Sequence, residues 1–236
     1  MHDGDNLPEI ICDAVRANNW QPRDHDVFAV AQKIVSKAEG RLVSLRQVVP
    51  SAEARRRASE TGKDPKLVEL ILRESTEVVR QGDKLIITEN HLGLVMANAG
   101  IDQSNVEEGC VLLLPQDPDQ SARDIKSHMD KAFGANIGVT IVDSIGRAWR
   151  NGITGHAIGV AGINVLLDLR KSSDLNNREL RVTEVAIGDE IAAAASLLMG
   201  QAGEGKPVVL VRGFTNIQGT ASAKALLRPK KQDLFR

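Results

Sequence analysis

The sequence lacks tyrosine altogether, and aromatic residues make up only 3% of its 236 residues. Because proteins that bind single-stranded nucleic acid stack bases on aromatic side chains, this composition disfavours that class of protein. Thirty basic and 31 acidic residues leave a net charge of −1, which argues against a broad binding surface for polyanions. We therefore expect no nucleic acid partner.

Cysteine is scarce as well, and long apolar runs are missing. Cys12 and Cys110 lack CxxC spacing, so they are expected to be buried free thiols in a reducing compartment. No apolar run approaches about 18 residues, the length that spans a membrane, and the first residues do not resemble a signal peptide. The sequence predicts a soluble, cytoplasmic protein with no membrane partner.

Helix-like and strand-like segments alternate along the whole chain. Helical spacing or helix-forming composition predicts helices at 7–18, 51–80, 121–133 and 183–199, the second interrupted at 63–65. Runs of apolar, mostly β-branched residues predict strands at 26–35, 84–89, 92–97, 111–114, 137–143 and 208–211, with a further extension of the sheet at 42–49. The alternation predicts an α/β or mixed α+β fold.

A group of polar side chains follows the strand predicted at 26–35. Ser36, Lys37 and Arg41 lie in one polar turn that also contains Gly40. A hydroxyl, an ammonium and a guanidinium in one loop suit a polyphosphate, although solvated cations in loops are common. The basic run at 55–57 is expected to be a solvated helix face.

Two acidic turns are candidate metal sites. Asp102 and Asn105 follow an apolar strand, and Asp143 with Ser144 ends the strand predicted at 137–143. A carboxylate fixed at the end of a strand can hold a hard cation. When either aspartate is taken alone, capping of a turn or a salt bridge is the favoured explanation.

Residues 200–207 read GQAGEGKP, which nearly matches the phosphate-binding pattern G-x4-G-K-[S/T]. Pro207 has neither the hydroxyl nor the N–H group that the pattern requires, and a helix is predicted before the segment where a P-loop needs a strand. The segment therefore predicts a glycine-rich turn, whose backbone N–H groups can converge on an anion.

Five blocks of sequence, read together, resemble the coenzyme F420-0:L-glutamate ligase family. They are VAQKIVSKAEGR (30–41), NAGIDQSNV (98–106), LLPQDPDQSA (113–122), VDSIGRAWRNGITGHAIGVAGI (142–163) and MGQAGEGKPVVLVRG (199–213). The resemblance implies a mixed α/β fold particular to that family, in an intertwined homodimer. It assigns 1–213 to a ligase domain that lacks the family's N-terminal strand, and 214–236 to a C-terminal tail.

The resemblance implies a GTP-dependent ligase that forms an amide bond. In the family, GTP phosphorylates the terminal carboxylate of F420-0, the amine of L-glutamate attacks the acyl phosphate, and GDP and phosphate are released. Further rounds add γ-linked glutamates. Mg²⁺ or Mn²⁺, two per site, is the expected cofactor, and a monovalent cation such as K⁺ is an optional one.

The resemblance also implies the site residues, and it assigns no side chain a certain catalytic role beyond metal-assisted chemistry. The residues that match nucleotide-binding positions are Ser36, Lys37, Arg41, Asn105, Gly203, Glu204 and Gly205. The residues that match metal ligands are Asp102, Asp143 and Ser144, together with Gln201 or Glu204, of which Gln201 is the first choice. Two other functions stay open: a nucleotide-binding homologue without turnover, and a nucleotide-dependent transferase with another acceptor.

Overall fold

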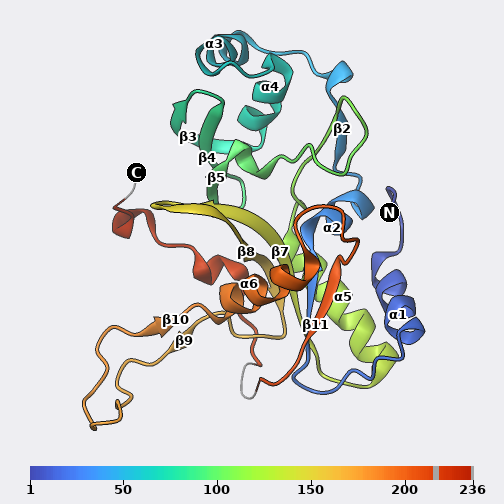
Figure 1. Cartoon of the computed structure of the whole chain (residues 1–236), viewed down its shortest axis with the longest axis vertical. Coiled ribbons are helices and arrows are strands. Elements are labelled where there is room, and N and C mark those ends of the chain that lie inside the picture. Colours follow the sequence, from blue (N-terminus) through green and yellow to red (C-terminus); the bar gives the residue numbers. More distant parts are fainter. Residues whose placement is uncertain (215–217, 235–236) are drawn as a thin grey trace.

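A four-stranded sheet forms the centre of the protein in this computed structural model, which describes residues 1–214 and 218–234 (Figure 1). The strands, in spatial order, are β11 (Val208–Val211), β1 (Val27–Ala31), β7 (Gly138–Arg147) and β8 (Arg150–Ala161). β1 and β7 run parallel, whereas the two outer pairs are antiparallel. The fold is therefore mixed α/β, as the sequence predicts.

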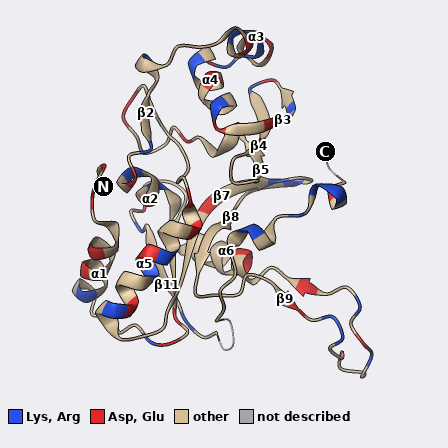
Figure 2. Ribbon diagram, turned by 180° about the vertical axis from the view of Figure 1, so that it is seen from behind, with Lys and Arg blue, Asp and Glu red and all other residues tan. Residues whose placement is uncertain are grey.

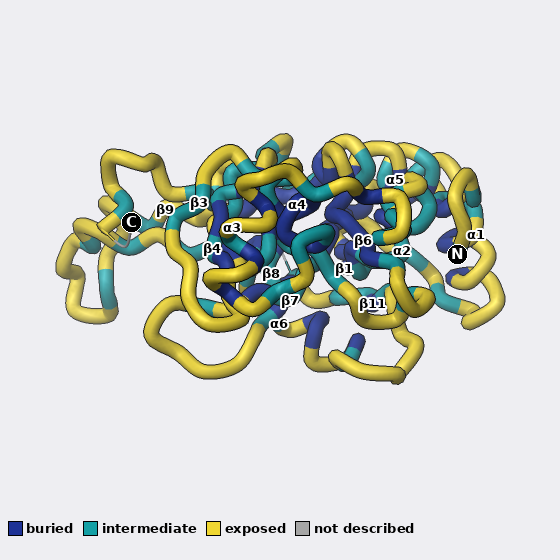
Figure 3. Tube along the Cα trace, turned by 90° about the horizontal axis from the view of Figure 1, so that it is seen from above, coloured by how far each residue is buried: buried dark blue, intermediate teal, exposed yellow. Residues whose placement is uncertain are grey.

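Helices cover both faces of this sheet. The helices are α1 (Leu7–Ala17) and α5 (Pro118–Phe133) on one face and α6 (Ile187–Met199) on the other. Phe28 and Val30 of β1 pack toward α1 and α5, and the alternate residues Val27 and Ala29 pack with α6. Burial on both faces explains why this strand is an unbroken apolar run. The buried segments accordingly gather in the middle of the molecule (Figure 3).

Local signals set the ends of α5. The Asp117 carboxylate accepts a hydrogen bond from the N–H of Gln120 at 3.0 Å, and Pro118 occupies the first turn, where its missing N–H costs nothing. The helix stops at Gly134, which has a φ of 65°. Basic and acidic residues are interspersed along α1 and α5 on the outer surface (Figure 2).

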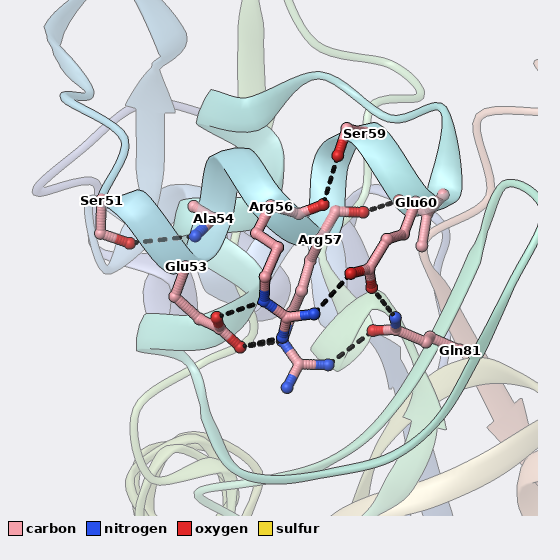
Figure 4. A network of polar contacts seen from close by, with 9 residues as sticks. Ser51, Glu53, Ala54, Arg56, Arg57, Ser59, Glu60 and Gln81 are labelled. Carbon is pink, nitrogen blue, oxygen red and sulfur yellow. Dashed lines mark hydrogen bonds and ion pairs between the residues drawn. The ribbon is translucent and has the colours of Figure 1, made fainter.

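A second lobe lies above the central sheet in Figure 1 and has its own apolar core. Its elements are α3 (Ala52–Thr61), α4 (Pro65–Arg73), β3 (Ser75–Gly82), β4 (Leu85–Asn90), β5 (Val95–Ala97) and the pair β2 (Leu42–Ser44) and β6 (Cys110–Leu112). The basic run of α3 is a solvated face as predicted: Arg56 bonds both Glu53 and Glu60, and Arg57 bonds Glu53 (Figure 4).

A thin hairpin projects from the body of the protein (Figure 1). It contains the paired strands β9 (Leu167–Asp168) and β10 (Glu184–Val185). Within the stretch predicted as a C-terminal tail at 214–236, residues 215–217 and 235–236 lie outside the described residues. The described part includes short 3₁₀ turns at Ala223–Leu226 and Lys230–Gln232, and Ala223 is buried against the core that contains α6.

Several predicted boundaries are wrong. The strand predicted at 26–35 ends at Ala31, and α2 (Gln32–Ala38) follows, so that Ser36 and Lys37 lie on a helix and not in a turn. The helical stretch predicted at 51–80 gives way to β3 at Ser75, where β-branched residues begin. The helix predicted at 183–199 begins only at Ile187, after β10.

Other predictions are confirmed. The hairpin predicted around 84–97 is the antiparallel pair of β4 and β5, and the helix predicted at 7–18 and the strand predicted at 208–211 are α1 and β11. Cys12 is a buried free thiol as predicted, whereas Cys110 is free but only half-buried. Among the described residues, no helix combines the length and the apolar composition needed to cross a bilayer.

Candidate functional site

A cavity of about 470 Å³ lies beyond the carboxyl end of β1, at the point where its parallel pairing with β7 ends. Ala31 of β1 pairs with Val142 of β7. The residues that follow them, Gln32 and Asp143, both line the cavity. Crevices at the carboxyl ends of parallel strands are common binding sites. Eight of the eleven predicted site residues line this cavity: Lys37, Asp102, Asn105, Asp143, Ser144, Gln201, Glu204 and Gly205.

Asp143 lies within β7 and not at its end, because the strand continues to Arg147. Burial raises the pKa of its carboxyl to about 7, opposed by a hydrogen bond from the Ser144 backbone and reinforced by the nearby Asp102 carboxylate. Because its pKa lies near neutral pH, this carboxyl readily binds either a proton or a cation under neutral conditions. Asp143 therefore lines the cavity, whereas the predicted end of the strand at this residue is wrong.

Asp102 lies in the turn that follows the apolar strand β5, as predicted, just after the short 3₁₀ turn Asn98–Gly100. Its backbone forms an antiparallel bridge with Leu112, with hydrogen bonds of 3.0 and 2.8 Å. Its Oδ2 lies 2.6 Å from Nζ of Lys33, and its Oδ1 accepts the Ser104 N–H at 2.6 Å. Burial tends to raise the pKa of Asp102, but the hydrogen bonds from Lys33 and Ser104 outweigh it and lower the pKa.

Lys37 and Asn105 connect three segments around the cavity. Nζ of Lys37 donates to the carbonyl oxygen of Asn105 at 2.8 Å, and Nδ2 of Asn105 donates to the carbonyl oxygen of Ala202 at 3.4 Å. Asn105 has a φ of 56°, a left-handed conformation that asparagine adopts more readily than most residues. These bonds join α2, the Asp102 turn and the glycine-rich segment.

The glycine-rich segment at 200–207 starts where α6 ends and leads into β11, so helix precedes strand as predicted. The carbonyl oxygen of Pro207 accepts the N–H of Ala31 at 2.8 Å, which fixes the segment beside the end of β1. Oε1 of Gln201 accepts the Ser144 hydroxyl at 2.7 Å. The Glu204 carboxylate instead accepts the N–H of Ala202 within its own segment at 2.8 Å.

The remaining three predicted residues do not line the cavity. Ser36 is buried and donates its hydroxyl hydrogen bond to Oε1 of Gln32 at 2.9 Å. Arg41 lies 2.7 Å from the Glu74 carboxylate and donates from Nε to the carbonyl oxygen of Leu114, beside a different cavity of about 360 Å³. Gly203 belongs to the glycine-rich segment but not to the lining.

Lys33 is a site residue that sequence reasoning missed. It lies four positions before Lys37, so the two lysines share one face of α2, and both line the cavity. The signal was hidden because the β-branched residues at 34–35 predicted that the strand continues. Recognition of a helix at 32–38 would have placed Lys33 beside Lys37.

The oxygen atoms around the cavity fit a hard divalent cation. Two carboxylates, a hydroxyl and an amide oxygen are supplied by Asp102, Asp143, Ser144 and Gln201. Such donors suit Mg²⁺ or Mn²⁺ better than Zn²⁺, which favours nitrogen and sulfur. Within 1–214 and 218–234, no group of three His, Cys, Asp or Glu residues is placed to hold a metal ion, so the donor set is a mixed one.

The protein is similar to known proteins along its entire sequence. The sequence profile of the family described as F420-0:Gamma-glutamyl ligase matches residues 1–213. The coenzyme F420:L-glutamate ligases of Methanopyrus kandleri and Methanothermobacter thermautotrophicus are each 46% identical to it, over 100% and 99% of this chain and 93% of each relative. That of Archaeoglobus fulgidus is 42% identical over 100% of this chain and 92% of the relative.

Proposed function

Because the chain belongs to the F420-0:gamma-glutamyl ligase family, we propose that it joins L-glutamate to coenzyme F420-0 with GTP as the phosphoryl donor. The observation that carries the proposal is the convergence of eight predicted residues, from four separate segments, on one cavity. The relatives named above, at 42 to 46% identity, support ligation of glutamate to F420 as the reaction.

The reaction requires two transfers, because a carboxylate oxygen is a poor leaving group. An oxygen of the F420-0 carboxylate attacks the γ-phosphorus of GTP, the bond to the β-phosphate oxygen breaks, and GDP leaves. The amine nitrogen of glutamate then attacks the acyl carbon, the amine loses a proton, and phosphate leaves. Phosphoryl transfer of this kind depends mainly on positioning and on neutralising charge, so it needs no covalent intermediate with the protein.

The cavity residues supply positioning and charge. Lys33, Lys37 and Lys206 bring three ammonium groups to a site for polyphosphate, and backbone N–H groups of the glycine-rich segment are available to phosphate oxygens. Asp102, Asp143, Ser144 and Gln201 would hold Mg²⁺ or Mn²⁺, which offsets the negative charge of the phosphates when bound. A second protomer and a monovalent cation stay predictions of the resemblance.

Two alternatives are tested by the same experiment. Purified protein is incubated with F420-0, GTP, L-glutamate and Mn²⁺, and the products are analysed by mass spectrometry. We expect F420 species that grow by whole glutamyl residues, with one GDP formed per amide bond. GTP binding without any product would favour the binding protein without turnover, which the names of the relatives disfavour. GDP formation only with a different acceptor would favour the transferase.

The raised pKa of Asp143 predicts that cation binding depends on pH. Between about pH 4 and pH 7 the folded protein holds a proton on Asp143 that the unfolded chain releases, so the stability of the cation-free protein falls as pH rises through this window. A divalent cation binds the deprotonated carboxylate. Saturating Mg²⁺ should therefore raise the Tm more at pH 8 than at pH 5.5, measured by calorimetry. The pH dependence should flatten in Asp143→Asn; equal Mg²⁺ shifts at both pH values in the wild type would contradict the prediction.

The hydrogen bond between Gln201 and Ser144 predicts which residue of the glycine-rich segment holds the cation. Gln201→Ala should weaken Mg²⁺ binding about tenfold, as measured by isothermal titration, because the amide oxygen that contacts the Ser144 hydroxyl is lost. Glu204→Ala is the matched variant, since its carboxylate bonds within its own segment. The reverse order of the two effects would identify Glu204 as the ligand instead.

A further inference from the structure

Lys33 forms an ion pair with Asp102, one of the two aspartates of the cavity. It is the second residue of α2, and its Nζ lies 2.6 Å from Oδ2 of Asp102 while also contacting the Ser104 hydroxyl. The Lys33 and Asp102 side chains are 29% and 27% exposed, so water screens this ion pair only in part. The pair therefore differs from the solvated ion pairs on the outer face of α3.

The charge of Lys33 acts on both aspartates of the site. Its hydrogen bond lowers the pKa of Asp102 against the effect of burial. Burial and the Asp102 carboxylate raise the pKa of Asp143, and the Lys33 ammonium acts in the opposite direction. Lys37, one helical turn further along α2, donates instead to a backbone carbonyl oxygen. Lys33 is thus the lysine that neutralises the charge of Asp102 in the cavity wall.

We propose that Lys33 is the internal counter-ion of the cation-free site, and that a divalent cation displaces its ammonium from Asp102 so that the ammonium becomes available to the nucleotide. This inference rests on the proposed function, since it takes the cavity to be a site for a divalent cation and a nucleoside triphosphate. It assigns Lys33 two successive partners of the same charge, a carboxylate and then a phosphate.

The physical reason is competition for one oxygen. Oδ2 of Asp102 already accepts the short charged bond from Lys33, so a cation that coordinates this oxygen must weaken or break the bond. The lysine side chain is a flexible four-carbon stem that carries a point charge, so it can change partners without movement of α2. The exchange would keep Asp102 paired both before and after the substrate binds.

The test compares Lys33→Met with the matched variant Lys37→Met, which removes the same charge from the next turn of the same helix. Isothermal titration with Mg²⁺ alone should show affinity about fivefold tighter in Lys33→Met, since the competing ammonium is gone. Lys37→Met should stay within about twofold of the wild type, because its ammonium bonds a carbonyl oxygen. At saturating Mg²⁺, GTP affinity should fall on the order of tenfold in Lys33→Met, whereas Lys33→Arg should retain part of it.

A second measurement uses the wild-type protein and does not depend on the folding of a variant. The side-chain ammonium resonance of Lys33, identified by its loss in Lys33→Arg, should shift as Mg²⁺ saturates the site. An unchanged resonance would overturn the inference, and so would an Mg²⁺ affinity in Lys33→Met equal to or weaker than that of the wild type. In either case the proposed function still stands if the wild-type protein binds Mg²⁺ and GTP. A wild-type protein that binds neither would overturn both.

Discussion

Replacing Asp102 or Asp143 by asparagine is expected to reduce the ligation rate on the order of 10³-fold or more while the protein stays folded. Asparagine keeps the size of the side chain and one oxygen, but it removes the charge that would hold the proposed divalent cation against the phosphates of GTP. The two residues are far apart in the sequence, yet both line the cavity, and the Asp102 carboxylate raises the pKa of Asp143. Loss of either carboxylate charge should therefore reduce the ligation rate to a similar extent.

The fold should survive because neither carboxylate supports the core. Asp143→Asn removes a charge whose burial is unfavourable, so the Tm of this variant should be unchanged or higher. Product formation, Mg²⁺ titration and thermal melting measure the three properties separately. Asp124→Asn is the control, since Asp124 is exposed on α5 and bonds only Gln120 among the hydrogen bonds of the described chain. Wild-type turnover in Asp102→Asn would restrict the role of Asp102 to pairing with Lys33 and would contradict a shared cation site.

Gly159→Ala is expected to destabilise the protein by about 3 kcal/mol or more, because a Cβ at this position would overlap the backbone carbonyl of Pro118. Pro118 is the first residue of α5, and Gly159 lies buried on β8 directly beneath it. Backbone atoms cannot move aside as a flexible side chain can, so the helix must lift from the sheet. For a chain of this size, the corresponding loss in Tm is roughly 6–12 °C.

Gly146→Ala on the neighbouring strand β7 is the matched control. No described atom lies within 4 Å of a Cβ built at Gly146, and its φ lies outside the left-handed region, so its Tm should change little. Melting followed by circular dichroism compares the two variants in one buffer. Equal Tm values for Gly159→Ala and Gly146→Ala would contradict the close packing of Pro118 against Gly159.

The sequence by itself determined the mixed α/β class, most of the helices and three of the four strands of the central sheet, whereas β8 was not predicted as a strand. Each of these follows from local information: the spacing of apolar residues, the cap at Asp117, and the stop at Gly134. The apolar run at 27–31 already indicated a strand buried on both faces. The resemblance of five blocks to one ligase family depended on residue order alone, and the family membership is confirmed.

Tertiary structure alone decided where the strand after Asp26 ends and which residues share the cavity. A seven-residue helix has little intrinsic stability in water, so α2 exists because it packs at the end of β1, and no local signal could separate it from the β-branched strand before it. That single change of structure places Lys33 on the cavity wall and turns the Ser36 side chain inward to Gln32.

The meeting of Asp102, Asp143 and the glycine-rich segment also required the tertiary structure. It follows from the parallel pairing of β1 with β7 and the antiparallel pairing of β11 with β1, which join segments distant in the sequence. Hydrophobic pattern sets which face of a strand is buried, but it does not state which strand becomes its neighbour. The residue types therefore indicated which ligands the site suits, whereas the convergence of these residues on one cavity depended on the long-range pairing of the strands.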